Sequence, residues 1–180
     1  MSLTLKQAGV FKGILIGVPI ALSIVFLGAY LNPFGYPESL SGIDRLSVAI
    51  LSSIIPAIFL AVSIGRLAKY RFFSPEDIDG SGLTYGTEKA KVLQSLLQNT
   101  LEQSLLALMV YLIWSVLMPA SSLSVVPIAA LCFGIGRLLF FKGYTSGAPA
   151  RALGFALTFF SSNAMLITII GYLIVQKIIL

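Results

Sequence analysis

Five long apolar runs divide this sequence, and they predict a helical membrane protein. The runs cover about residues 13–30, 46–64, 88–118, 125–141 and 152–175. Each is close to or above the roughly 20 residues with which a helix crosses the hydrocarbon core. None shows the short alternating pattern of barrel strands. The pattern therefore predicts an all-α integral membrane protein with five transmembrane helices.

The first two runs each raise a question about their structure. Residues 13–30 resemble a signal peptide, but the run exceeds the usual signal core of about 7–15 residues and no clear small-x-small cleavage site follows. We therefore interpret it as a transmembrane helix. Pro56 lies inside the second run, and proline in a membrane helix commonly produces a kink.

Composition agrees with a membrane protein and narrows its chemistry. The chain is 57% hydrophobic and 11% charged, whereas soluble domains carry roughly 25% charged residues. Its net charge of +5 is explained by cytoplasmic loops that obey the positive-inside rule, so we expect no nucleic-acid partner. Cys132 is the only cysteine and the chain has no histidine. An intramolecular disulfide is thus excluded, and no metal site is expected.

The basic residues predict an orientation. Lys6 and Lys12, the segment 66–91 and the segment 142–151 fall on one side of a five-span arrangement. The positive-inside rule places this side in the cytoplasm, together with the N-terminus. We expect a multi-pass protein of the inner, cytoplasmic membrane. The loop within residues 65–91 is expected to be solvated, and its acidic residues lack the spacing of a calcium loop.

The third run begins with a polar face that ends inside the membrane. At about 100° per residue its polar side chains fall within one arc, namely Lys91, Gln94, Ser95, Gln98, Asn99 and Glu102. Glu102 lies roughly 16 Å along the helix from Lys91, at 1.5 Å per residue. A carboxylate at that depth normally faces protein, water or a partner. Two interpretations stay open: an ion pair with Arg137 or Arg151, or a polar binding site.

A second polar stretch connects the last two runs. Arg137, Phe140, Phe141 and Tyr144 have the spacing that places side chains on one helix face. Gly147 and Pro149 then interrupt the chain, and proline favours the first turn of a helix. Arg151 should therefore lie in the opening turn of the last helix. There its guanidinium adds to the positive helix end and attracts an anion.

Together the two polar stretches resemble the MAPEG family, the membrane-associated proteins of eicosanoid and glutathione metabolism. One match is TEKAKVLQSLLQNTLEQ, residues 87–103, which contains an Asn-x-x-Glu pair at Asn99 and Glu102. The more specific match is RLLFFKGYTSGAPAR, residues 137–151. The resemblance implies a MAPEG-like four-helix transmembrane bundle at residues 46–180. Residues 1–45 then hold one additional N-terminal transmembrane helix and a loop.

The resemblance also implies a homotrimer that binds glutathione and acts on lipophilic small molecules. Arg151 matches the arginine that stabilises the glutathione thiolate, and Tyr144 matches a tyrosine that contacts glutathione. Asn99 and Glu102 match a pair that hydrogen-bonds the peptide, with Arg137 nearby. The side chains of Arg66 and Lys69 are expected to meet the carboxylate of a ligand bound to a neighbouring subunit.

Three substitutions divide the functional interpretations. Glutathione-binding members carry arginines seven and four residues before the asparagine, where this chain has Val92 and Ser95, and Phe140 replaces a tyrosine or histidine. The first interpretation is a glutathione- or other thiol-dependent transferase or peroxidase, with Arg151 and Tyr144 as its catalytic residues. The second is a non-catalytic binding or structural protein of the same fold. A proton-coupled transporter is disfavoured, because the polar face stops after Gln103 and no inverted repeat is detectable.

Overall fold

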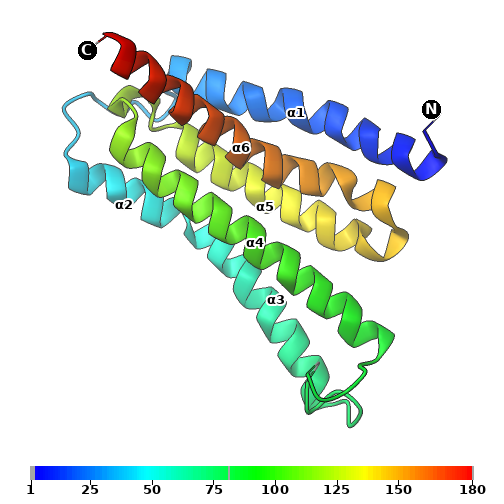
Figure 1. The fold of residues 1–180 in the computed structure, drawn as a ribbon. Helices are drawn as coiled ribbons and strands as arrows, with labels where there is room; N and C mark the ends of the chain where they lie inside the picture. Colours follow the sequence, from blue (N-terminus) through cyan, green and yellow to red (C-terminus); the bar gives the residue numbers. More distant parts are fainter. Residues whose placement is uncertain (1–2, 81, 180) are drawn as a thin grey trace.

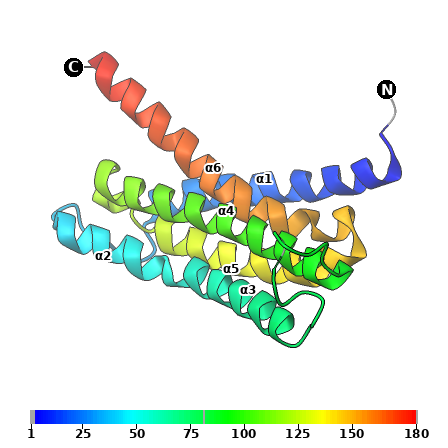
Figure 2. The ribbon, with the colours of Figure 1, turned by 60° about the horizontal axis from the view of Figure 1, so that its bottom comes forward.

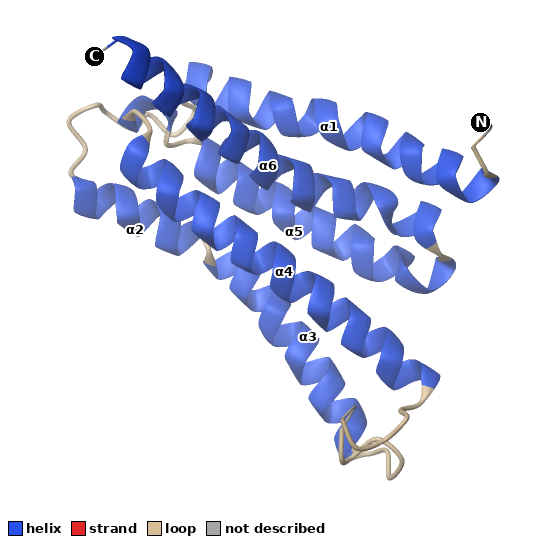
Figure 3. Ribbon diagram, viewed as in Figure 1, coloured by secondary structure: helices blue, strands red, loops and turns tan. Residues whose placement is uncertain are grey.

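The computed structural model of the protein describes residues 3–80 and 82–179, and the regular structure in this part is helical throughout (Figure 3). Two short 3-10 turns, η1 and η2, lie between longer helices. The elements are α1 (Leu5–Leu31), α2 (Gly42–Ser52), α3 (Ile54–Phe72), α4 (Glu88–Leu117), η1 (Ala120–Ser122), α5 (Val125–Gly143), η2 (Tyr144–Ser146) and α6 (Ala148–Ile179).

The five predicted spans are confirmed as helical segments that are long and apolar enough to cross a membrane. Helices α1, α2 and α6 each begin at least four residues earlier than predicted. The first starts at Leu5, where the side chains of Thr4 and Gln7 form a reciprocal capping box. The last starts at Ala148, so Pro149 and Arg151 both lie in its first turn, as predicted.

The second span is two helices rather than one kinked helix. Helices α2 and α3 meet at Ser53, three residues before Pro56. Proline has no N–H, and its ring crowds the carbonyl four residues earlier, here that of Ser52. The discontinuity therefore lies just before the proline, as this crowding requires.

The spans form two groups (Figure 1). Helix α6 packs along α1 on one side and α5 on the other, while α3 pairs with α4. The N-terminus, the α3–α4 loop and the α5–α6 turn all lie at one end of the molecule. The basic segments are thus gathered on one side, as the sequence predicted. A second view shows the C-terminal part of α6 projecting beyond the other helices (Figure 2).

Helix α1 approaches α6 closely because small residues line the contact. A Cβ atom added to Gly13 would lie 2.8 Å from the Cβ of Ala152, and one added to Gly17 would lie 2.5 Å from the Cβ of Ala156. Both helices therefore run in the same direction in van der Waals contact. Small residues at four-residue intervals commonly permit such packing in membranes.

The α3–α4 loop is held by the buried carboxylate of Asp77, which is an exception to the solvated loop that the sequence predicts. Its side chain is 2% exposed. It accepts hydrogen bonds from the Thr87 backbone N–H and hydroxyl at 2.8 Å each, and from the Ser74 hydroxyl at 2.7 Å. Burial alone raises the pKa of Asp77, but these hydrogen bonds and the charge of Arg71 lower it overall. The charged carboxylate thereby fixes the start of α4.

Candidate active site

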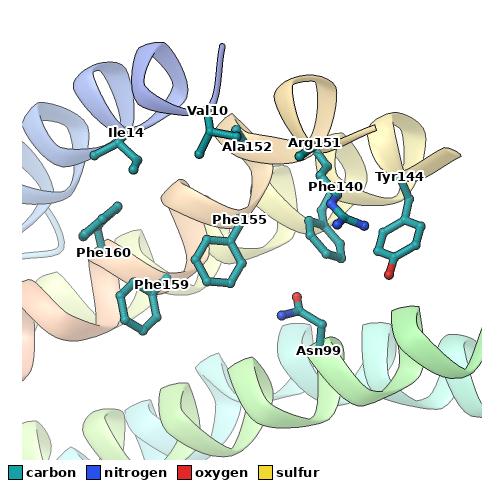
Figure 4. A pocket seen from close by; sticks show the side chains of 11 residues that line it. Val10, Ile14, Asn99, Phe140, Tyr144, Arg151, Ala152, Phe155, Phe159 and Phe160 are labelled. Atoms are coloured by element: carbon teal, nitrogen blue, oxygen red, sulfur yellow. The ribbon is translucent and has the colours of Figure 1, made fainter. Parts of the chain in front are cut away.

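A cavity of about 350 Å³ lies between α1, α4, the α5–α6 turn and α6 (Figure 4). Its polar groups lie toward one end, where Asn99, Tyr144 and Arg151 contribute side chains. The remaining lining is mostly apolar and includes Phe140, Phe155, Phe159, Phe160, Val10, Ile14, Ala148 and Ala152. An apolar pocket with a few polar groups at one end is the usual form of a small-molecule site.

Close packing of α5 on α6 brings two of the predicted site residues together. A Cβ atom added to Gly143 would lie 2.3 Å from the Ala150 carbonyl oxygen, so only glycine fits at this turn. The turn places the Arg151 guanidinium over the Tyr144 ring, 4.2 Å from its centroid. Cation–π attraction favours this stacked arrangement.

The Arg151 guanidinium keeps its hydrogen-bonding capacity for other groups. Within residues 3–80 and 82–179 it makes no hydrogen bond or ion pair and is only half-buried. It lies in the first turn of α6, where backbone N–H groups are unpaired and the helix dipole is positive. Arg151 therefore presents several donors and a positive charge at the polar end of the cavity.

Arg137 has very different surroundings, although the sequence grouped it with Arg151. Its side chain is 0% exposed. It donates hydrogen bonds to Asn99 Oδ1 at 2.9 Å and to Thr158 Oγ1 at 2.7 Å. Its guanidinium also lies 4.4 Å from the centroid of the Phe140 ring. Arg137 thus connects α4, α5 and α6 beside the cavity, without lining it.

The bond from Arg137 orients the Asn99 side chain. Because Asn99 Oδ1 accepts from Arg137, the amide nitrogen points elsewhere, and Figure 4 shows it directed toward the Phe159 side of the cavity. An amide nitrogen can only donate. Within the described lining no carboxylate is present, so the polar end of the cavity consists of donors and the Tyr144 hydroxyl.

Glu102 does not take part in this arrangement. Its carboxylate lies on the exposed face of α4 and accepts a hydrogen bond from Gln98 Nε2 at 2.8 Å. The predicted pairing of Glu102 with Arg137 or Arg151 is therefore absent from the described part of the chain. Asn99 and Glu102 are three residues apart, which places them about 60° apart around a helix of 3.6 residues per turn. Asn99 can therefore face the cavity while Glu102 faces outward.

Comparison with known protein families identifies the fold. The sequence profile of the MAPEG family matches residues 46–171, which is more than half of the chain. The chain belongs to the MAPEG family. Searches of curated proteins and of solved structures found no match. The protein is therefore an integral, multi-pass membrane protein of this family, and α1 lies outside the matched region as the predicted additional helix.

The polar face of α4 is divided among three surroundings in this MAPEG chain. Asn99 faces the cavity, whereas Gln98 and Glu102 face outward. The first part of α4 lines a separate pocket of about 200 Å³ beneath the α3–α4 loop, and Arg71 there donates to Gln94 Oε1 at 3.1 Å. Ser95 belongs to this second pocket. The single polar groove that the sequence predicted is thus not formed.

The two basic residues of α3 also lie away from the cavity. The Arg66 guanidinium lies 5.5 Å from the centroid of the Phe141 ring, on the outer side of α5. Lys69 is exposed, and neither residue lines the cavity within this chain. Their proposed contact with a ligand bound to a neighbouring subunit stays a prediction.

Several residues of the site were not found from the sequence. Thr158 gave no signal, because a threonine on an apolar helix is ordinarily bonded to its own backbone. Ile14 was read only as part of the first span, and Val10 lies before the predicted start of that span at residue 13. The spacing of Gly9, Gly13 and Gly17 would have indicated that α1 packs closely on another helix.

Proposed function

We propose that the protein is a membrane-embedded, thiol-dependent transferase or peroxidase that acts on lipophilic electrophiles. The observation that carries this proposal is the Arg151–Tyr144 pair at the donor-rich end of an apolar cavity. A cation beside a thiol favours the thiolate, which is the nucleophile. MAPEG membership supports the same class, because the family includes glutathione-dependent transferases.

In this proposal each group has a defined role. The free thiol has a pKa of about 8.5 and is mostly protonated at neutral pH. Arg151 and the N-terminus of α6 stabilise the thiolate, and the Tyr144 hydroxyl donates a hydrogen bond to the sulfur. The thiolate forms a carbon–sulfur bond with the electrophile, and the leaving group departs. With a peroxide, two thiols are oxidised to a disulfide while the peroxide is reduced to an alcohol and water.

Glutathione is the first thiol to test, but the site also admits other thiols. Arg151 is the only cation that lines the described cavity, whereas glutathione carries two carboxylates. Val92 and Ser95 stand where the resemblance implies arginines, and a missing charge-assisted hydrogen bond costs about 1.5–3 kcal/mol. The proposal therefore names a thiol as the cofactor and leaves its remaining groups to experiment.

A homotrimer with its N-terminus in the cytoplasm forms part of the proposal. The Gln98–Glu102 pair is exposed on a helix that spans the membrane. Ionisable groups at such depth normally face protein or water rather than lipid. Contact with another subunit would cover the pair, as the family resemblance implies, while lipid surrounds the remaining apolar surface.

The alternative is a non-catalytic membrane protein of the same fold. The hydrogen bond from Arg137 to Asn99 favours this alternative, because Asn99 then serves to join helices. In this alternative the polar residues act as interhelical contacts. The protein would then form the same bundle without activating a thiol.

Turnover measurements distinguish the two functions. The protein purified in detergent is mixed with chlorodinitrobenzene, or with a lipid hydroperoxide, and with glutathione or a smaller thiol. The proposal predicts thiol-dependent turnover that Arg151→Ala abolishes and Lys142→Ala retains, because Lys142 is an exposed cation near the same turn. Absence of turnover with every thiol and both electrophiles would favour the non-catalytic alternative.

A further inference from the structure

One wall of the cavity comes from α1, which lies outside the region that matches the family. Val10 and Ile14 are the two α1 residues that line it. Figure 4 shows Ile14 facing Phe160, and Val10 beside Ala152. The apolar end of the cavity thus depends on a segment that the matched residues 46–171 do not contain.

The position of this wall is fixed by the packing of α1. Glycine at positions 13 and 17 leaves no space for a Cβ atom against α6. A Cβ on Gly13 would also lie 2.8 Å from the backbone nitrogen of Leu153, so the backbones themselves are in contact. Val10 and Ile14 are therefore held in register with Arg151 and Ala152 at the start of α6.

Another pocket, distinct from the one beneath the α3–α4 loop, lies next to the same residues. It has a volume of about 340 Å³ and shares Val10, Ile14 and Ala148 with the first cavity. Its other lining residues are Leu3, Lys6, Gln7 and Phe11. Val10 and Ile14 therefore border two neighbouring apolar spaces, one next to Arg151 and one at the beginning of α1.

The chemistry of the first cavity indicates the class of molecule that fits it. Arg151 and the Asn99 amide nitrogen form a donor-rich end that suits one anionic group. The phenylalanine side chains of α6 continue from it as an apolar lining. A single-chain amphiphile with one anionic head group matches both ends.

We propose that Val10 and Ile14 of α1 determine the length of the apolar chain that the site accepts. A single-chain carboxylate measures this length in the thiol-free protein, where its head group takes the position of the thiolate at Arg151. This inference rests on the proposed function for the identity of the site. Its content is a role in specificity for the additional helix. Bulkier side chains at these positions would fill the apolar part of the cavity and exclude long chains while admitting short ones.

Direct binding measurements test this role. Native mass spectrometry of the detergent-purified protein gives the affinities for hexanoate, decanoate and hexadecanoate. We expect wild type to bind hexadecanoate more tightly than hexanoate, since each buried methylene adds to affinity. Ile14→Trp should weaken hexadecanoate binding by about tenfold or more, while hexanoate binding stays within about twofold.

Leu15→Trp is the matched control, because Leu15 is the next residue and its side chain is 56% exposed on the outer face of α1. It should leave the ratio of the two affinities unchanged. Val10→Phe is the second variant, and it should reproduce the selective loss if Ile14→Trp does not fold. Equal affinities for short and long chains in wild type, or equal ratios for the Ile14 and Leu15 variants, would overturn the inference.

These measurements separate the inference from the proposed function. Suppose that wild type prefers long chains, that Ile14→Trp removes this preference, and that no thiol transfer is detected. This result would refute the proposed function alone. Suppose instead that wild type transfers thiols and that Ile14→Trp does not change the ratio of the affinities for hexadecanoate and hexanoate. This result would refute the role of α1 alone.

Discussion

Arg137 and Arg151 lie beside the same cavity and have opposite surroundings. Arg137 is 0% exposed and donates to Asn99 and Thr158. Arg151 is half-buried and stacks on Tyr144, with no hydrogen bond inside the described chain. A buried guanidinium whose bonds join three helices contributes to the fold. A guanidinium with unused donors at the edge of a cavity is the one available to a ligand.

The largest effect on stability is expected from Arg137→Ala. This change opens a cavity and leaves the Asn99 and Thr158 side chains without their partner. We expect the free energy of unfolding to fall by about 2–5 kcal/mol. Denaturation in detergent measures it, with Arg66→Ala as a control because Arg66 is an exposed cation against an aromatic ring. If the Arg137 variant were as stable as wild type, the claim that Arg137 contributes to the fold would be contradicted.

Arg151→Ala should reverse the pattern, with a large effect on activity and a small one on stability. Loss of a group that stabilises charge in the reaction typically lowers kcat by about 10²–10³-fold. The free energy of unfolding should fall by no more than about 1 kcal/mol, because the side chain has no hydrogen-bond partner in the described chain and loses only its cation–π contact with Tyr144. Kinetics and denaturation of one preparation measure both. Equal losses in both would mean that Arg151, too, is structural.

Thr158→Val isolates one bond of Arg137. Valine keeps the shape of threonine but cannot accept a hydrogen bond, so one N–H of a buried guanidinium loses its partner. We expect a destabilisation of about 1.5–3 kcal/mol. Thr168→Val is the matched control, since the Thr168 hydroxyl donates only to the Ala164 carbonyl in its own helix. Similar unfolding curves for the two variants would show that the bond to Arg137 adds nothing.

Glu102→Gln is expected to have the smallest effect at the cavity. The carboxylate faces outward and bonds to Gln98, so thiol transfer should change by less than about 0.5 kcal/mol in activation free energy. The proposed trimer, measured by size-exclusion chromatography with light scattering, should dissociate more readily. A loss of activity as large as that of Arg151→Ala would instead indicate that Glu102 of one subunit serves the site of another.

Sequence patterns predicted the spans and the place of Arg151 in the first turn of α6, because both depend on local features. The family resemblance, and not periodicity, grouped Tyr144 with Arg151. Apolar run length determines the spans, and Pro149 determines where α6 begins its first turn. Even so, periodicity missed the start of α1. Thr4 caps the helix there, and the residues that follow it are less apolar than the predicted span.

Contacts between distant segments were not predictable in the same way. Helical periodicity placed Asn99 and Glu102 in one arc, but it does not tell which neighbour each side chain meets. The Arg137–Thr158 bond and the α1 wall depend on how α5, α6 and α1 pack, and that packing depends on close contacts at Gly13 and Gly143. For this reason the ion pair of Glu102, one of the two interpretations left open, is not found in the described chain.

The thiolate absorbance of a bound thiol tests the central claim most directly. A cation beside a thiol lowers the thiol pKa by about 1–3 units, so wild type titrated with glutathione or a smaller thiol should develop the thiolate band at neutral pH. Lys142→Ala should retain the band, and Arg151→Ala should lose it while the protein stays folded, with an unfolding curve close to that of wild type. A band of equal intensity in Arg151→Ala, or no band in wild type with any thiol, would contradict the assignment of Arg151 as the residue that stabilises the thiolate.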